Sequence, residues 1–288
     1  MRSQDGGGSW VRFLPVLPLR DENPAQSTPV VTWLIVAACV VAFLAWQPGP
    51  FSDTTDDIEF TLRRAAIPCE LVSGEPLSVD EVVATYEFGD GSACDVGSPT
   101  SPPYDAGKNV WLAVVVSMFL HGSILHIAGN MLFLWVFGNN VEDRLGKVGF
   151  ALFYLVGGIA AIAAHVAVDP ASTVPVVGAS GAIAAVMGAY LVWFPNAPVR
   201  TVVIFYFIAI MDIRAKWLLG FWLVLQFFTS PNAGVAWVAH VGGFVFGVLV
   251  ALVLRGVGRR PDAPRLPGPG PPGWYPPPPP SRWPDGRY

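Results

Sequence analysis

Residues 178–189 read Gly-Ala-Ser-Gly-Ala-Ile-Ala-Ala-Val-Met-Gly-Ala, within a stretch of 30 residues that contains no Asp, Glu, Lys or Arg. Trimming this stretch at prolines and polar residues leaves an apolar run at 176–194, and a membrane-spanning helix needs about 20 mostly apolar residues. Gly181, Ala185 and Ala189 recur every four residues along the run. Small residues at this spacing let helix backbones approach closely in lipid. The stretch therefore predicts a membrane helix that packs tightly against a neighbour.

The composition of the whole chain supports a membrane protein. Of its 288 residues, 53% are hydrophobic and only 13% are charged, against about 45–50% and about 25% in an ordinary soluble domain. The mean hydropathy is +0.50. A net charge of -4 leaves no basic surface for nucleic acid, and three cysteines are too few for a disulfide scaffold. We therefore expect a chain that contacts the lipid bilayer and does not bind nucleic acid.

Further apolar runs predict more crossings. One run starts near 213 and ends near 229, where Thr-Ser-Pro-Asn forms a turn signal. We expect 201–211 to lie along the membrane surface and 109–120 to be a partly embedded approach that does not span. The remaining apolar runs are 30–47, 124–139, 149–168 and 236–255. The prediction is an all-α membrane protein, a bundle of six transmembrane helices.

The positions of the charges predict the orientation. With the N-terminus inside, 14 of the 17 basic residues fall on inner segments, so the positive-inside rule places both termini in the cytoplasm. We expect a multi-pass protein of the plasma membrane. Its predicted parts are a cytoplasmic segment at 1–29, a six-helix domain at 30–255 and a proline-rich cytoplasmic tail at 256–288.

Two segments outside the helices carry further expectations. The long first outer loop, about 48–108, holds twelve acidic residues together with Cys69 and Cys94. In an oxidising exterior the two cysteines could form a disulfide, and in a reducing one both would stay as thiols. The tail holds 12 prolines between residues 261 and 288, which predicts disorder or polyproline II. It could dock a proline-recognising partner or remain a solvated tail.

A few polar residues interrupt the apolar helices, and such residues are functional suspects. His126 and Asn130 fall two and six residues into the second helix, and Ser180 and His240 fall about four residues into the fourth and sixth. At 1.5 Å per residue all four lie roughly 3–9 Å below the outer boundary. We expect His121, just before the second helix, to join them in lining a wet cavity that is open to the outside.

Each of these signals also has an ordinary explanation. A serine near a helix start is more often a cap, a lone histidine can bond a neighbouring carbonyl, and the i, i+4 pair His126 and Asn130 could join helices by hydrogen bonds. Small residues tie the signals together, because Ala239, Gly243 and Gly247 repeat the four-residue spacing on the sixth helix. Close packing there could bring Ser180 within hydrogen-bond reach of His240. A serine needs such a base to become a nucleophile.

Four motifs in order resemble the rhomboid intramembrane serine proteases, over residues 29–255. They are His-Gly-Ser-Ile-Leu-His at 121–126 followed by Asn130, Val-Glu-Asp-Arg-Leu-Gly at 141–146, Gly-Ala-Ser-Gly at 178–181, and Ala-His-Val-Gly-Gly at 239–243 with Gly247. The resemblance implies a six-helix core whose serine–histidine dyad opens to the outer face. It also implies cleavage of transmembrane protein substrates, with no cofactor and no metal.

The resemblance assigns roles to individual residues. Ser180 would be the nucleophile and His240 its general base, while His126 and Asn130 would hold the oxyanion together with the Ser180 backbone N–H. His121, Gly178 and Gly181 would support the site. The residues with a structural part in the motifs would be Glu142, Arg144, Gly243 and Gly247.

Two departures from the family pattern stand out. Some relatives carry a tyrosine four residues after the nucleophile, stacked on the catalytic histidine, whereas this chain has Ala184. The missing tyrosine leaves the orientation of His240 unexplained. We expect a dyad in which no carboxylate orients the histidine. Some relatives also carry a Trp-Arg pair in the first outer loop, which this loop lacks.

Other functions remain as alternatives. A metal site built from the histidines lacks the H-E-x-x-H pattern and an intramembrane carboxylate. A transporter would need paired broken helices or a charged site at the midplane. An inactive relative that binds transmembrane clients would lose the serine or the histidine, and both are present here. The sequence therefore favours a serine endopeptidase.

Overall fold

The computed structural model describes residues 16–23, 25–49, 54–94, 101–204, 208–228 and 236–256. The predicted docking segment in the proline-rich tail lies outside these residues. The described part of the chain is mostly helical, and each of the six predicted apolar runs coincides with a helical segment. These are α1 (Val30–Val41) with the π-helical η2 (Ala42–Trp46), the two arms of α6 (Ile124–Val168), α7 (Ser180–Trp193), α8 (Ala215–Gln226) and α9 (Trp237–Val253).

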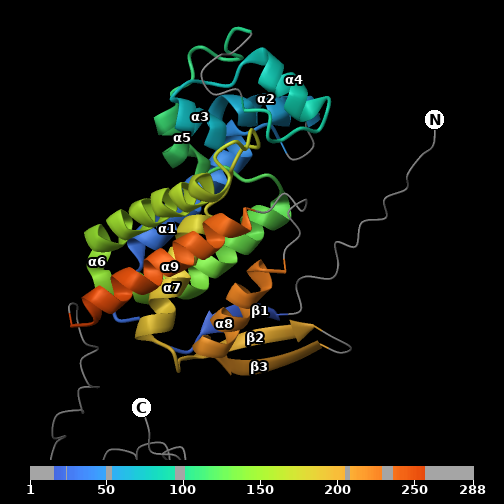
Figure 1. The fold of residues 1–288 in the computed structure, drawn as a ribbon. Coiled ribbons are helices and arrows are strands. Elements are labelled where there is room, and N and C mark those ends of the chain that lie inside the picture. The colour runs from blue at the N-terminus through green and yellow to red at the C-terminus, as the bar shows by residue number, and fades with distance from the viewer. Residues whose placement is uncertain are drawn as a thin grey trace, which may run out of the picture. The chain divides into compact units, whose positions relative to one another are not determined.

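Helix α7 is the centre of the helical bundle. Every residue from Gly181 to Tyr190 is buried, as expected for a helix that is apolar on all sides. Figure 1 shows α6, α7 and α9 running side by side, and each of the three contacts the other two. A short 3-10 turn, η4 (Leu254–Gly256), follows α9.

Helix α6 contains the predicted second and third runs, joined at Gly146. This glycine has a φ of +72°, a left-handed conformation that interrupts the helix. It separates two arms at 124–145 and 147–168. Judged by length and composition alone, α6 is the one helix of the described residues long enough and apolar enough to cross a membrane, and the other apolar segments run 12 to 17 residues.

The start of α7 differs from the prediction. The helix begins at Ser180 rather than near residue 176, so the expected depth of about four residues for this serine is wrong. Gly178 has a φ of +124°, which a right-handed helix cannot include. Ser180 therefore occupies the first helical position, where its backbone N–H has no partner within the helix.

The all-α prediction is wrong, because three strands form an antiparallel sheet in the order β1 (Val16–Asp21), β2 (Pro198–Ile204), β3 (Ile208–Arg214). The hairpin β2–β3 replaces the surface segment expected at 201–211, and β1 lies in the segment expected to be a plain N-terminal extension. Val199 and Thr201 are fully buried, whereas Arg200 between them is partly exposed. This alternation and the β-branched residues are typical of a strand, whereas absence of charge alone does not distinguish a short strand from a helix.

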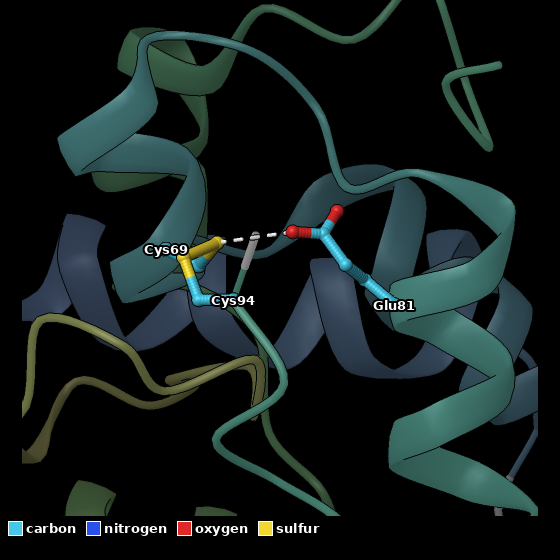
Figure 2. Close-up of side chains that lie close together, drawn as sticks. All are labelled: Cys69, Glu81 and Cys94. Atoms are coloured by element: carbon cyan, nitrogen blue, oxygen red, sulfur yellow. Dashed lines mark hydrogen bonds between the residues drawn. A yellow bond between two sulfur atoms is a disulfide. The ribbon is translucent and has the colours of Figure 1, made fainter. Parts of the chain in front are cut away.

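The segment between η2 and α5 (Val110–Ser117) contains a small helical lobe. Helices α2 (Thr54–Arg64), α3 (Pro68–Ser73) and α4 (Val79–Tyr86) pack around a separate apolar cluster that includes Leu62, Ile67 and Leu77. Cys69 and Cys94 form a disulfide beside this cluster, with Glu81 close to it (Figure 2). We call the described residues 54–94 and 101–109 the α2–α4 lobe.

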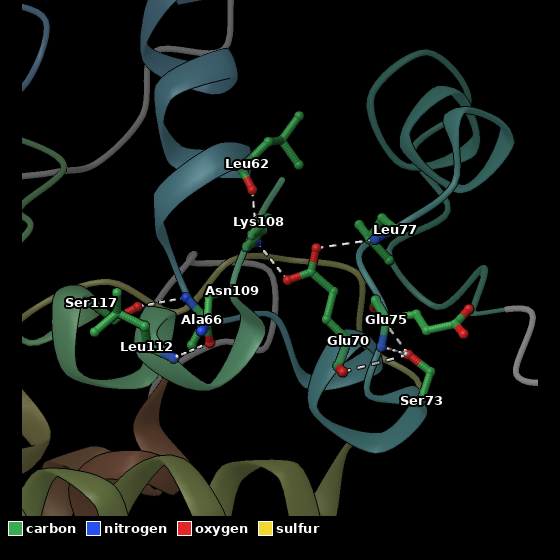
Figure 3. Close-up of polar contacts among 10 residues, drawn as sticks. All are labelled: Leu62, Ala66, Glu70, Ser73, Glu75, Leu77, Lys108, Asn109, Leu112 and Ser117. Atoms are coloured by element: carbon green, nitrogen blue, oxygen red, sulfur yellow. Dashed lines mark hydrogen bonds and ion pairs between the residues drawn. The ribbon is translucent and has the colours of Figure 1, made fainter. Parts of the chain in front are cut away.

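A buried ion pair joins two parts of this lobe just before the start of α5. The Lys108 ammonium lies 2.5 Å from the Glu70 carboxylate and donates to the Leu62 carbonyl oxygen at 2.7 Å (Figure 3). Both charged side chains are 2% exposed, so each depends on the other to remain buried. Nearby, the Ser117 hydroxyl accepts from the Ala66 backbone N–H at 2.6 Å. The ion pair therefore fixes the end of the lobe, and the Ser117 contact attaches the lobe to α5.

Candidate functional site

Two glycines of α9 let this helix cross α7 with the two backbones in contact. A Cβ atom on Gly243 would lie 2.1 Å from the Gly181 carbonyl oxygen, and one on Gly247 would lie 1.9 Å from the Ala185 carbonyl oxygen. Gly181 itself faces Ala161 on α6, where a Cβ would lie 2.6 Å from the alanine methyl. Any side chain at these positions would push the helices apart.

This crossing brings Ser180 to His240. The Nε2 atom of His240 lies 2.8 Å from the Ser180 Oγ atom, a normal hydrogen-bond distance. The two residues are 60 positions apart in the chain, and each lies in the first turn of its helix. A histidine nitrogen at this distance can accept the hydroxyl proton of the serine.

Both residues line a cavity of about 430 Å³, with His126 and Asn130 on another wall. The Asn130 side-chain NH₂ group is buried and makes no hydrogen bond within the described part of the chain. Buried donors almost always have a partner. The NH₂ group of Asn130 is therefore free to donate to a group that enters the cavity.

His126 presents a second donor to the same cavity. Its Nδ1 atom accepts a long hydrogen bond of 3.4 Å from the Gly122 backbone N–H. A neutral imidazole carries its hydrogen on the other nitrogen, so Nε2–H is the donor. That atom lies beside Gly178, since a Cβ on Gly178 would be 2.8 Å from His126 Nε2 and 3.5 Å from Ser180 Oγ. Only glycine leaves room for the histidine here.

His121 is placed differently from our expectation. It is 1% exposed and is not among the described residues that line the cavity. Its ring packs edge-on against His126, with 5.2 Å between the ring centroids. Gln47, just after η2, holds the His121 backbone by accepting from its N–H at 2.9 Å and donating to its carbonyl at 3.0 Å. His121 therefore lies behind His126 and supports it.

Two residues of α8, absent from the sequence prediction, contact His240. The Gln226 side-chain oxygen lies 2.8 Å from His240 Nδ1, and the Trp222 ring packs against the imidazole with 5.9 Å between centroids. Ala184, at the position where some relatives carry a tyrosine that stacks on the histidine, is fully buried. In this chain, α8 supplies the side chains that contact His240. The sequence did contain a signal for this contact, because Gln226 is the one polar residue between Trp217 and Phe228.

Glu142 and Arg144 lie far along the first arm of α6 and serve separate parts of the fold. Glu142 accepts from the backbone N–H groups of Val31 and Thr32 at 2.9 and 2.7 Å and from the Thr32 hydroxyl at 2.8 Å, so it caps the N-terminus of α1. The Arg144 guanidinium lies 4.9 Å from the centroid of the Trp193 ring and donates to the Arg255 carbonyl. Both contacts join α6 to other elements.

Metal-binding residue types gather in one place within the described residues, at Cys69, Glu81 and Cys94. The two sulfur atoms there are joined to each other, and thiolates rather than disulfide sulfurs are the metal ligands of cysteine. Glu81 meanwhile accepts from the Ser78 backbone N–H at 2.7 Å in the capping box of α4. This cluster stabilises the lobe and does not form part of the cavity.

Comparison with known proteins matches the same part of the chain. The Rhomboid domain model matches residues 108–257, just over half of the sequence. Presenilin-associated rhomboid-like protein A, mitochondrial, of Danio rerio is 33% identical over 156 residues, covering 52% of this chain and 38% of that protein. Rhomboid protease GlpG of Serratia proteamaculans is 30% identical over 150 residues, covering 52% of this chain and 50% of that protein.

The human Presenilin-associated rhomboid-like protein, mitochondrial, is 31% identical over 156 residues, covering 52% of this chain and 39% of that protein. The chain thus matches half or less of the length of these relatives. The matched region contains the serine, both cavity histidines, the asparagine and the glycines of the helix crossing. The chain belongs to the rhomboid family and is a helical integral membrane protein.

Proposed function

We propose that the chain is an intramembrane serine endopeptidase that cleaves transmembrane protein substrates. The observation that carries the proposal is the 2.8 Å contact between Ser180 Oγ and His240 Nε2 in a cavity that Asn130 and His126 also line. Family membership supports it, since one relative is named a rhomboid protease. Other relatives are named only rhomboid-like, so the intact dyad is what favours catalysis over client binding.

The mechanism follows from which atoms around Ser180 can accept a proton and which can donate a hydrogen bond. His240 Nε2 takes the Ser180 proton as the oxygen attacks the scissile carbonyl carbon. The carbonyl oxygen becomes an oxyanion, and the Ser180 backbone N–H, Asn130 and His126 Nε2–H are the donors that can stabilise it. His240 then gives its proton to the leaving amine, which departs and leaves an acyl-enzyme. Water, deprotonated by His240, attacks this ester, and His240 returns the proton to the Ser180 oxygen as the acid product leaves.

The membrane arrangement is part of the same proposal. Six crossings with both termini in the cytoplasm follow from the positive-inside rule, and they direct the cavity mouth to the outer side. We propose the cell membrane as the location, although relatives named mitochondrial show that the family occurs in other membranes. The cavity contains a polar wall in an apolar bundle, so it can admit the water that hydrolysis requires.

The test uses the full chain reconstituted in liposomes with a fluorescent transmembrane substrate that contains a helix-breaking Gly-Pro pair near its outer end. We expect cleavage by the wild type and none above background by Ser180→Ala or His240→Ala. Leu249→Ala, at a 57% exposed position of α9, is the control for helix substitution and should cleave normally. A fluorophosphonate probe should label wild type and Leu249→Ala but not Ser180→Ala.

Two results would contradict the proposal. Equal cleavage by all four proteins would show that the dyad does not catalyse the reaction. Binding of the substrate by wild type and Ser180→Ala alike, with neither cleavage nor labelling in the wild type, would favour the client-binding alternative.

A further inference from the structure

Gln226 is a buried amide with two specific partners at the end of an apolar helix. It is the last residue of α8 and is 8% exposed. Its Nε2 atom donates to the Trp222 carbonyl oxygen at 3.0 Å, and its Oε1 atom lies 2.8 Å from His240 Nδ1. A buried polar side chain next to lipid is costly unless it is satisfied. Both ends of this amide are satisfied.

The Trp222 carbonyl determines which way the amide points. A carbonyl oxygen can only accept a hydrogen bond, so the NH₂ group of Gln226 must face it. The amide oxygen then faces His240. The reversed amide would place two oxygens against each other at Trp222 and is therefore excluded on energetic grounds.

The amide orientation in turn determines the tautomer of His240. An amide oxygen only accepts, so the histidine must carry its hydrogen on Nδ1. In the neutral ring, Nε2 then has a free lone pair, and this is the atom that lies 2.8 Å from the Ser180 hydroxyl. One chain of hydrogen bonds thus runs from Trp222 through Gln226 and His240 to Ser180.

We infer that Gln226 is a positioning residue that holds His240 in the Nδ1–H tautomer and stabilises the imidazolium formed when Ser180 loses its proton. The inference rests on the proposed function. The amide takes the place that a carboxylate has in a three-residue triad. Being neutral, it does so without adding a buried charge inside the membrane.

The other groups around His240 do not explain how its ring is oriented, which supports the positioning role of Gln226. The titratable side chains that act electrostatically on His240 are His126 and His165, both from α6. Among the described residues, the hydrogen-bond partners of its ring are Gln226 and Ser180. The Trp222 ring packs against the imidazole at 5.9 Å and against Phe244 at 6.1 Å. The ring therefore blocks one face of His240 while the amide fixes its rotation.

Three variants of the full chain test the inference by cleavage kinetics. Gln226→Met keeps the shape and removes the acceptor. We expect kcat to fall about 10- to 100-fold, the loss that follows when the hydrogen-bond partner of a metal-bound histidine is removed, with KM little changed. Gln226→Glu should recover activity and shift the acidic limb of the pH profile to higher pH, because a carboxylate favours imidazolium. Val224→Met, at a 51% exposed position of α8, should match wild type.

A packing role alone would not move the acidic limb. Gln226→Met within twofold of wild type, or Gln226→Glu with an unchanged limb, would overturn the inference. The ¹⁵N spectrum of histidine-labelled protein in micelles gives a readout that does not need activity, with the His240 signals assigned by their loss in His240→Ala. We expect Nδ1–H in the wild type and loss of this preference in Gln226→Met.

The two claims can fail separately. A wild type without Ser180-dependent cleavage but with an Nδ1–H tautomer that depends on Gln226 would contradict the proposed function and retain the positioning of His240. A cleaving wild type with Nε2–H on His240 would contradict the positioning and retain the protease.

Discussion

The two ends of α7 use polar side chains in opposite ways. At the Ser180 end, the Asn130 NH₂ group has no partner among the residues that the structure describes, and Asn130 lines a cavity together with Ser180, His240 and His126. At the Tyr190 end, the tyrosine hydroxyl donates to Asp21 at 2.8 Å, and Asn140 bonds to Asp21, Asn23 and Asn139. One end of α7 faces a cavity, and the other is closed by internal hydrogen bonds.

The difference shows how to separate functional from structural polar residues in a membrane bundle. Asn130 and Asn140 are both buried, at 8% and 3% exposure, and both lie on the first arm of α6. Only the hydrogen bonds distinguish them. A satisfied amide contributes to folding, whereas a buried amide without a protein partner costs stability, and our proposed function gives Asn130 its part as an oxyanion donor.

The largest expected effect is a difference between alanine variants of these two asparagines, one in activity and the other in stability. Asn130→Ala should lower kcat/KM by about 10²–10³, the usual loss for one oxyanion donor. It should leave the unfolding midpoint close to wild type, because the Asn130 NH₂ group has no hydrogen bond to the described residues. Asn140→Ala is the matched control and should lose about 1–3 kcal/mol of stability while its folded fraction stays active. Cleavage assays and thermal unfolding in micelles measure both. The reverse outcome, with Asn130→Ala mainly unfolding the protein, would remove the distinction.

Glu142 offers the next largest effect, confined to stability. Glu142→Ala leaves the Val31 and Thr32 backbone donors at the start of α1 without an acceptor and should cost about 2–3 kcal/mol. Glu142→Gln retains acceptor oxygen and should cost less. Denaturant titration of the reconstituted protein would measure both losses. A fall in kcat for the folded variants at low temperature would show that this capping contact also affects the catalytic end.

The smallest effect is the pH dependence at Asp21. Burial raises the pKa of its carboxyl from 3.8 to about 6, despite the opposing hydrogen bond from Tyr190. The folded protein therefore binds this proton more tightly than the unfolded chain, and the stability contributed by the group is full below pH 4 and is lost as pH rises through 6. Asp21→Asn should flatten this part of the curve of unfolding midpoint against pH. An identical slope in both proteins between pH 4 and 7 would contradict it.

Much of the helical fold could be read from local pattern. The six apolar runs coincide with helical segments because absence of charge over a sufficient length is a local property. The four-residue spacing of Gly243 and Gly247 likewise marks the face that contacts α7, since side chains four apart lie on one face of a helix. The error at 201–211 has a local cause too, because a short apolar run does not by itself distinguish strand from helix.

Other features depend on partners far along the chain. Strand β1 contains Pro18 and pairs with β2, so that Val16 lies opposite Val203. Pro18 cannot donate to a ladder, and it is tolerated because β1 is an edge strand. No pattern near residue 16 indicates a partner at 203. The same holds for Asp21, whose partner Tyr190 is 169 residues away.

The sequence alone determined that this is a helical membrane protein with a serine, two histidines and an asparagine near one end of the bundle, because hydropathy and helical periodicity are encoded in neighbouring residues. Only the tertiary structure decided how His240 is held. The end of α8 must lie beside α9 for Gln226 to reach Nδ1 and for Trp222 to cover the ring. Such a contact depends on how whole helices pack, and packing is decided by shape in three dimensions.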